Sequence, residues 1–517
     1  MKESLRQSMA LLHTWTGLLF GWLLFAVFAT GTAAYFQAEI TRWMQPEIVG
    51  SSDPVTAAEN AVDYLARTAP DADGWIITLP NSRSATTQMF WQPAVEEGQS
   101  YSSAILGPDG KEVSGRETNG GYFLYRFHFD LHYLPVIWAR YLVGIAAMFM
   151  LVAILSGVIT HKKIFADFFT LRFGKGQRSW LDAHNVTAVL ALPFHLMITF
   201  TGLVTLATLY MPWGIAANYT APQTFFESLF SSPPDVPRSG ERAPLAPIDA
   251  MMRKASSQWN GALPGSINVT NPGDVTATVT LVSSSEDAIG VRGDRLRFDG
   301  TTGQLLQAGS PQTPALKTES AMIGLHAGRY ADWGLRWLYF ICGLGGTIMV
   351  GSGLVMWTAK RRTRLPDPQR PHFGFRLVER LNIAAISGLG AGIATYFLAN
   401  RLLPFGMDGR ADWEINSLFL AWAAIALWGA IRPIRRAWAE TLALTAALFF
   451  AIVPVDTMTT SRGLLASLWA RDWVYVGFDS AMLLLAVGFG YAAHKAMVAR
   501  PSASSRKARR SPEGTPA

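Results

Sequence analysis

The chain has 517 residues, of which half are hydrophobic and only 16% are charged, and it carries 18 tryptophans. Because soluble chains carry about 25% charged residues, this composition excludes a soluble globular protein and indicates a polytopic α-helical membrane protein with some mass outside the bilayer. The net charge of +7 lies mainly in short loops between apolar stretches, so it reports membrane topology and gives no indication of a nucleic-acid partner.

The chain begins with an apolar span followed by a polar segment. Residues 1–36 hold a short polar head and the first span, Leu11–Phe36, which is too long and too rich in tryptophan for a cleaved signal peptide. Residues 37–130 are mostly polar and have the pattern of a small α+β domain. Its predicted elements are a helix at Pro54–Thr68 and strands at Trp75–Leu79 and Thr86–Trp91.

The order of an apolar span followed by a polar α+β segment then recurs. Residues 131–213 contain the second span, Leu134–Ile159, a basic loop and the third span, Ser179–Trp213. Residues 214–325 form a second polar α+β segment. Its predicted elements are a helix at Pro247–Gln258, strands at Ser266–Thr270 and Thr276–Val282, and a hairpin at Leu296–Leu306.

Five further spans complete the predicted topology. Residues 326–360 hold the fourth span, Trp333–Trp357, and residues 361–498 hold a loop and four more spans. These four are predicted at Leu381–Leu403, Trp413–Ile431, Leu442–Val455 and Val474–His494, and residues 499–517 form a polar tail without stable structure. Because basic residues gather in loops on one side, we expect both termini in the cytoplasm, both polar segments outside, and about eight spans.

The third predicted span carries two imidazoles, His184 and His195, eleven residues apart. In a straight helix this spacing is about three turns, so both side chains lie on one face, roughly 16 Å apart along the axis. Ionisable side chains inside a membrane helix are rare and usually functional. Two on one stripe suggest ligands for a flat, apolar group, most simply haem.

A single cysteine, Cys342, lies within an apolar run. The sequence therefore excludes an internal disulfide, a thiolate-ligated iron–sulfur cluster and the Cys-x-x-Cys-His attachment of a c-type haem, which leaves His and Met as ligands. No Rossmann fingerprint, flavin motif or P-loop is found. The glycine runs at 343–346 and 388–392 lack a preceding strand and indicate close helix packing.

The histidines recur in a duplicated pattern. The repeats are His13 with Gly31 and His184 with Gly202, each eighteen residues apart, and the pairs Leu131-His132 and Leu325-His326. Duplicated membrane halves commonly place their sites at the interface between the repeats. We therefore predict that His13 meets His184 near the cytoplasmic face. By the same argument, His132 meets His326 near the outer face.

This combination resembles the PepSY-associated transmembrane family of bacteria. The resemblance rests on Leu-His-x-Trp-x-Gly-Leu at Leu12–Leu18, the two Leu-His pairs, the Ser-Gly-Val and Ser-Gly-Leu span ends and the two α+β segments, and it covers about residues 5–365. It implies a bacterial inner-membrane protein with two periplasmic PepSY-like domains in a duplicated span–PepSY–span arrangement. Members include reductases of ferric siderophores that carry b-type haem, so the resemblance implies electron transfer towards the periplasm.

The resemblance also implies a cofactor, its ligands and its partners. The family's recurrent histidines match His13, His132, His184 and His326, which would be the axial ligands of two haem b groups, and His195 matches the histidine within the third span. Two imidazoles leave haem iron without an open position, which suits an electron relay. The expected partners are a ferric siderophore or other Fe(III) chelate, and a quinol or cytoplasmic reductase as donor. No residue is identified as catalytic.

Several residues have a second interpretation. His195, beside Pro193, could bond a backbone carbonyl freed by the proline, while the other matched histidines could be ordinary interfacial residues. His128, one turn before His132, is an alternative ligand. His161, beside two lysines, is typical of a solvated loop, and His372 and His494 are expected at the surface. The arginines at the outer span ends, Arg126, Arg140, Arg329 and Arg336, suit either haem propionates or ordinary snorkelling.

Two other functions remain open at this point. One is a haem-free anchor or signalling protein whose PepSY-like domains modulate a periplasmic protease. The other is a transporter, which the duplication favours and the scarcity of Asp and Glu within the spans disfavours.

Overall fold

The computed structural model divides into two compact units, Met1–Arg361 and Arg362–Ala517. The structure describes residues 4–48, 50, 52–92, 102–160, 172, 177–229, 236–284, 286, 288–309 and 313–498. His161 and the predicted tail at 499–517 lie outside these residues.

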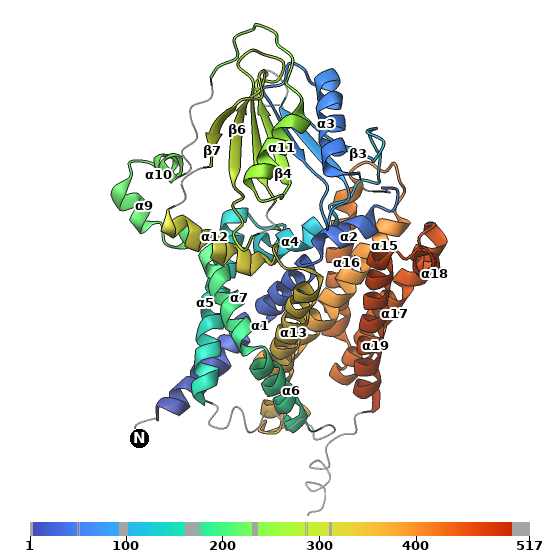
Figure 1. The fold of residues 1–517 in the computed structure, drawn as a ribbon. Helices are drawn as coiled ribbons and strands as arrows, with labels where there is room; N and C mark the ends of the chain where they lie inside the picture. The colour runs from blue at the N-terminus through green and yellow to red at the C-terminus, as the bar shows by residue number, and fades with distance from the viewer. Residues whose placement is uncertain are drawn as a thin grey trace, which may run out of the picture. The chain divides into compact units, whose positions relative to one another are not determined.

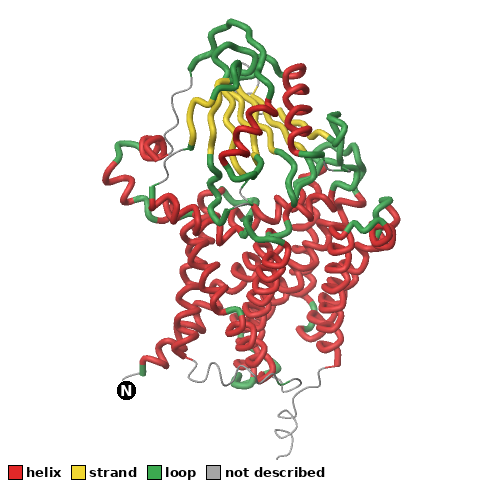
Figure 2. Tube along the Cα trace, viewed as in Figure 1, coloured by secondary structure: helices red, strands yellow, loops and turns green. Residues whose placement is uncertain are grey.

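Among the described residues of the first unit, seven antiparallel strands form one sheet (Figures 1 and 2). They are β1 (Gly74–Thr78), β2 (Thr87–Gln92), β3 (Ser102–Leu106), β4 (Pro264–Thr270), β5 (Thr278–Ser283), β6 (Arg295–Asp299) and β7 (Leu305–Ala308), in the order β3-β2-β1-β4-β5-β6-β7. β1 pairs with β4, and Trp75 lies opposite Val269. The strands of the two polar segments are therefore neighbours, and the two domains expected from the sequence share a single sheet.

Alternation along the strands gives this sheet one buried face. In β1, Trp75 and Ile77 are buried whereas Ile76 between them is 41% exposed. Two helices, α3 (Pro54–Thr68) and α11 (Ile248–Gln258), pack on the buried face and complete its core (Figure 1). Each polar segment thus supplies one helix and several strands to a common core.

Within the first unit, a layer of three helices lies between the sheet and the long apolar helices of that unit (Figure 1). It consists of α2 (Gln37–Met44), α4 (Gly120–Asp130) and α12 (Pro314–Ala327). The sequence patterns did not predict α4 or α12, although α12 begins with a recognisable signal. The Thr313 hydroxyl accepts the N–H of Leu316, and a proline follows at the first helical position.

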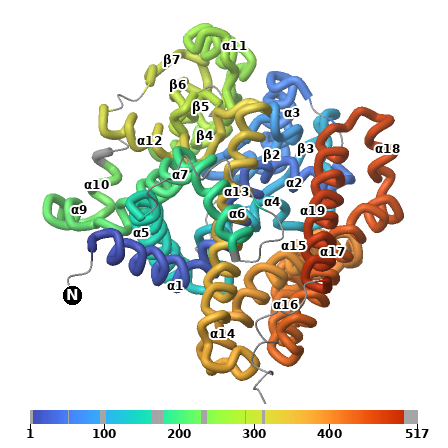
Figure 3. Tube along the Cα trace, turned by 90° about the horizontal axis from the view of Figure 1, so that it is seen from below, coloured from blue at the N-terminus to red at the C-terminus, as the bar shows by residue number. Residues whose placement is uncertain are grey.

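Three straight helices of this unit are long and apolar enough to cross a membrane: α1 (Leu5–Ala34), α5 (Val136–Thr160) and α13 (Trp333–Arg362). They coincide with the first, second and fourth predicted spans. α1 and α5 lie side by side when the unit is viewed from below (Figure 3).

The third predicted span is broken in the structure. It consists of α6 (Gln177–Leu190) and α7 (Leu192–Thr205), which are bent by 69° relative to each other. The cause is Pro193, which has no N–H to donate within a helix and is placed in the first turn of α7. The prediction that His184 and His195 share one face of a straight helix is therefore wrong. Beyond α7, the short helix α8 (Ala207–Tyr210) replaces the predicted end of the span at Trp213, and two more short helices follow, α9 (Trp213–Asn218) and α10 (Pro222–Leu229).

The second unit is a bundle of four spans that overlap the last four predicted ones. The first is formed by α14 (Phe373–Ile383), a π-helical segment (Ala384–Gly388) and α15 (Leu389–Leu402). The others are α16 (Arg410–Ile431), α17 (Ile434–Thr459) and α19 (Trp473–Val498), with the short α18 (Leu464–Trp469) before the last. Among the described residues there are seven membrane-length helices, or eight if the bent pair counts as one span. The chain is a multi-pass membrane protein.

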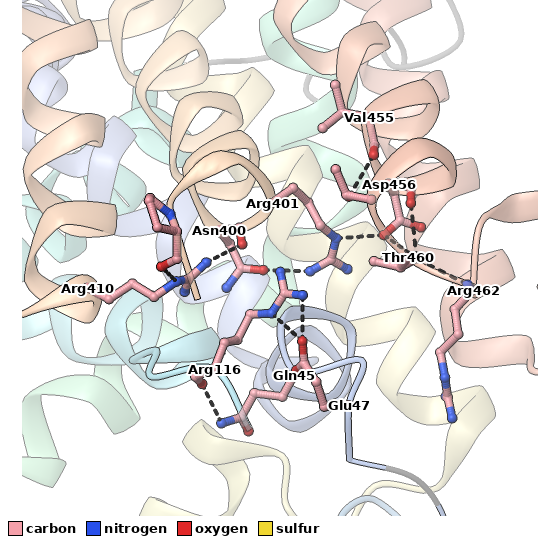
Figure 4. Close-up of polar contacts among 12 residues, drawn as sticks. Gln45, Glu47, Arg116, Asn400, Arg401, Arg410, Val455, Asp456, Thr460 and Arg462 are labelled. Atoms are coloured by element: carbon pink, nitrogen blue, oxygen red, sulfur yellow. Dashed lines mark hydrogen bonds and ion pairs between the residues drawn. The ribbon is translucent and has the colours of Figure 1, made fainter. Parts of the chain in front are cut away.

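Buried ion pairs join the helix ends of this second unit (Figure 4). Arg401 donates to Asp456 at 2.6 Å, and both side chains are 0% exposed. Arg410 pairs with Glu414, which also accepts from the Asn400 amide at 2.7 Å. The sequence reading that these spans hold few acidic residues missed this network, because Arg401 and Asp456 lie on different helices and Asn400 of α15 contacts Glu414 of α16. Figure 4 also draws Arg116 with Glu47, an ion pair of the first unit.

The shared sheet predicts that damage in one half spreads to the other. Trp75→Ala removes a buried indole from β1 and should cost about 3–5 kcal/mol of stability. Because β1 joins β2 to β4, hydrogen exchange should accelerate in β4 and β5 as well as in β2. Ile76→Ala, on the exposed side of the same strand, serves as the control. Loss of protection confined to β1–β3 would contradict the single cooperative sheet.

Candidate functional site

Four histidines of the first unit form two pairs. His13 on α1 and His184 on α6 have ring centroids 6.2 Å apart, with the ring planes at 75°. His128 on α4 and His326 on α12 have centroids 6.1 Å apart, at 35°. We call His13 and His184 the distal pair, and His128 and His326, which belong to the helix layer beneath the sheet, the sheet-side pair.

Each of the four rings is hydrogen-bonded through Nδ1 to a backbone carbonyl of another helix. The acceptors are Ala153 O for His13 and Met349 O for His184, both at 2.8 Å, Val27 O for His128 at 2.7 Å, and Ile198 O for His326 at 3.0 Å. A carbonyl can only accept, so Nδ1 carries the proton and Nε2 of each neutral ring carries the lone pair. Such a bond fixes the orientation of a histidine that ligates a metal.

A glycine lies against each of the four rings. A Cβ on Gly31 would be 2.5 Å from the His128 ring, and one on Gly202 would be 2.8 Å from the His326 ring. A Cβ on Gly157 or on Gly353 would be 3.2 Å from the ring of His13 or of His184, respectively. The recurring glycines noticed in the sequence therefore leave room for the four imidazoles.

The predicted pairing of His132 with His326 is wrong, because His128 occupies that place. Helix α4 ends at Asp130, and Leu131 and His132 both have a left-handed backbone with φ of 52°. The His132 ring packs instead against Phe123 and Tyr133. His128 was the alternative ligand expected from the sequence. The two Leu-His dipeptides were misleading because Leu131-His132 lies just beyond the end of α4, whereas Leu325-His326 lies within α12.

His195 joins neither pair. It is fully buried on α7, its Nε2 lies 3.4 Å from Cys342 O of α13, and its ring meets the edge of Phe28. Within the described part of the chain, its Nδ1 has no hydrogen-bond partner. A carbonyl contact was one of its two expected roles, although the carbonyl belongs to a neighbouring helix and was not freed by Pro193. His372 and His494 are exposed, as expected.

A cavity of about 1040 Å³ adjoins the sheet-side pair. His128 and His326 line it from the helix layer, loops of the sheet contribute Arg83 and Arg292, and the start of β6 contributes Arg295. Its volume is at the upper end of the range of about 300–1,000 Å³ that small-molecule sites span. The sheet-side imidazoles are therefore accessible to a ligand held beneath the sheet.

The arginines at this end of the spans are mostly paired with acids. Arg126 and Arg140 both bind the buried carboxylate of Asp130, at 2.5 and 2.8 Å. Arg336 binds Glu39 at 2.5 Å. Arg329 is exposed and lines the cavity. Of the four arginines considered from sequence, only Arg329 thus lines the cavity without an ion pair to a described acidic residue.

The electrostatics of the sheet-side pair favour uncharged rings. Burial lowers the pKa of His128 below its ordinary value of 6.5. Burial, with the nearby His128 as a smaller cause, lowers the pKa of His326 to about 4. Both rings are therefore neutral at pH 7, which is the form that can donate a lone pair to a metal.

The donor set fits a metal held by a macrocycle. Two imidazoles that ligate one metal from opposite sides, each through a bond of about 2 Å, have ring centres about 6 Å apart. Within the described residues, no group of three or more His, Cys, Asp or Glu side chains is placed to hold a bare metal ion. The remaining ligands would have to come from a ring such as porphyrin, whose bis-histidine iron is typical of electron-transfer haem.

Comparison with known proteins gives two findings. The family model described as the PepSY-associated TM region matches residues 10–360. An uncharacterized protein of Pseudomonas aeruginosa, PA4219, is 26% identical over 308 residues, which cover 57% of this chain and 76% of the relative. The matched family region includes all four paired histidines, their glycines and the whole sheet.

The glycines beside the rings allow a direct test of the site. Gly31→Ala should push the His128 ring away and cost about 1–3 kcal/mol through overpacking, because its Cβ would lie 2.5 Å from that ring. Thermal unfolding should show the loss, and any porphyrin bound at the sheet-side pair should dissociate. Gly17→Ala on the same helix meets nothing within 4 Å and is the matched control. If Gly31→Ala unfolds at the same temperature as Gly17→Ala and keeps the same amount of porphyrin, the His128 ring does not occupy the space beside Gly31.

Proposed function

The chain belongs to the PepSY-associated transmembrane family, and on that premise we propose that it is a b-type haem protein of the bacterial inner membrane. It carries electrons across the membrane and reduces an Fe(III) chelate, such as a ferric siderophore, in the periplasm. The observation that supports this most strongly is the pair of His–His contacts, with 6.2 and 6.1 Å between ring centroids.

The proposed orientation follows from charge. Arg6 lies at the start of α1, and Lys360, Arg361 and Arg362 end α13, at the ends of these spans nearer to the distal pair. By the positive-inside rule these ends are cytoplasmic, and the sheet is periplasmic. The distal pair then receives electrons from a quinol or a cytoplasmic reductase, and the sheet-side pair delivers them.

The protein contributes ligands and geometry to the proposed electron path. When bound between two imidazoles, haem has no open coordination position and supplies one-electron transfer. The four backbone carbonyls hold the imidazole rings in one tautomer and orientation. His13 and Val27, whose carbonyl holds His128, are fourteen residues apart on α1, a rise of about 21 Å, so the two pairs lie at different depths. We propose no ligand role for His195, which joins neither pair.

The cavity beneath the sheet is the proposed place of the Fe(III) chelate. It adjoins the sheet-side imidazoles and has exposed cationic side chains, Arg295 and Arg329, along its lining. One electron converts Fe(III) to Fe(II), and the lower charge weakens the hold of the hard oxygen donors of a siderophore. The metal is then released for uptake. Each two-electron donor molecule therefore supports the reduction of two ferric ions.

The haem content of the purified protein is the first test. We expect two haem b per chain by pyridine haemochrome analysis, and one in His184→Ala, because each pair needs both imidazoles. His132→Ala should keep two, since His132 lies in neither pair. A colourless wild-type protein would overturn the proposal. It would favour a haem-free anchor or, if purified protein supports substrate flux, a transporter.

Reduction of the chelate is the second test. Wild-type protein in proteoliposomes with quinol inside should form Fe(II) from a ferric chelate added outside. His326→Ala should lose this activity while the haem at the distal pair is still reduced, because only the sheet-side ligand is missing. A chromogenic Fe(II) chelator that cannot cross the membrane reports the product. Undiminished Fe(II) formation by His326→Ala would exclude the sheet-side pair from the path.

A further inference from the structure

Helix α12, which carries His326 in its last turn, is attached to the sheet by polar contacts at two points. The first involves the loop between β5 and β6. Arg292 binds Glu319 of α12 through contacts of 3.0 to 3.2 Å, and the Arg292 backbone N–H donates to the Ser320 hydroxyl at 3.1 Å. Gly324 packs so closely on the Ile289 carbonyl that no side chain fits there.

The second attachment is made by Arg83, in the loop between β1 and β2. One of its guanidinium nitrogens, Nη2, donates to Gly328 O at 3.3 Å and to Ala331 O at 2.8 Å, and it also contacts Arg329 O. These carbonyls immediately follow the C-terminus of α12. The C-terminal end of a helix carries partial negative charge, so a cation held next to it by these carbonyls is favourable.

Arg83 is itself held in place. Its Nε lies 3.3 Å from Glu286, which also accepts from the Ser82 hydroxyl at 2.9 Å, and the Arg83 side chain is only 16% exposed. The guanidinium therefore bridges a carboxylate of the sheet and the turn that ends α12. His326 is two residues before the first of the three carbonyls that Arg83 contacts.

We infer that Arg83 is a positioning residue for His326: by binding the turn at 328–331, it fixes the end of α12 and with it the imidazole of the sheet-side pair. The inference rests on the proposed function for its consequence, since the orientation of an axial imidazole tunes a bound haem. It makes the sheet part of the proposed electron-transfer site, because Arg83, in a loop of the sheet, sets the orientation of His326 on the neighbouring helix α12.

Two readouts on full-length protein test the inference. In Arg83→Ala, hydrogen exchange of the amides at 324–331 should accelerate roughly tenfold or more, because hydrogen bonds to a charged group are lost. The midpoint potential and low-spin EPR signal of the sheet-side haem should shift, while those of the distal haem stay unchanged. Arg83→Lys should restore part of the effect, since an ammonium keeps the charge near Glu286 but lacks the guanidinium fork.

Arg253→Ala is the matched control, because Arg253 pairs with Asp249 on α11, away from α12. It should change neither readout. If wild-type protein binds haem but Arg83→Ala leaves both the exchange and the sheet-side signals unchanged, the inference is wrong. If wild-type protein binds no haem, the proposed function fails, and the exchange measurement alone decides whether Arg83 holds α12.

Discussion

Four hydrogen bonds from imidazole to backbone carbonyl hold the first unit in its observed arrangement. Each bond joins two helices: α1 to α5, α6 to α13, α4 to α1, and α12 to α7. An imidazole half-buried among apolar helices is costly unless it is hydrogen-bonded, and each carbonyl has a second lone pair to offer. The rings therefore both require and specify the packing of these helices. The glycines beside the four rings follow from this packing, because a larger side chain there would displace the imidazole.

Local patterns in the sequence predicted most of the elements. Apolar length identified the seven membrane-length helices of the described residues but not the break in the third predicted span, and alternation identified β1, β2 and β4 to within a few residues. The pairing of His13 with His184 also followed from the repeat. These features depend on short-range periodicity, or on a His–Gly spacing that recurs in two stretches of the same chain.

The features that escaped prediction depend on long-range packing or on a helix end. The pairing of β1 with β4 brings together strands that lie far apart in the chain, and no local pattern specifies it. His128 replaced His132 because α4 stops at Asp130, so the later histidine leaves the helix. In the second unit, Arg401 and Asp456 each look like an isolated charge in the sequence, and only the fold shows that they are partners. Removing one of them would leave the charge of the other buried and without its ion-pair partner.

The continuous sheet has a consequence for biogenesis. Strand β1 is completed at Thr78, but its partner β4 begins only at Pro264, after α5 and the bent pair α6 and α7. Until then the open side of β1 offers unpaired N–H and C=O groups, which can template aggregation with other nascent chains. The first half of the chain therefore passes through a stage that is prone to aggregation, and a product truncated before β4 would keep this unpaired edge permanently.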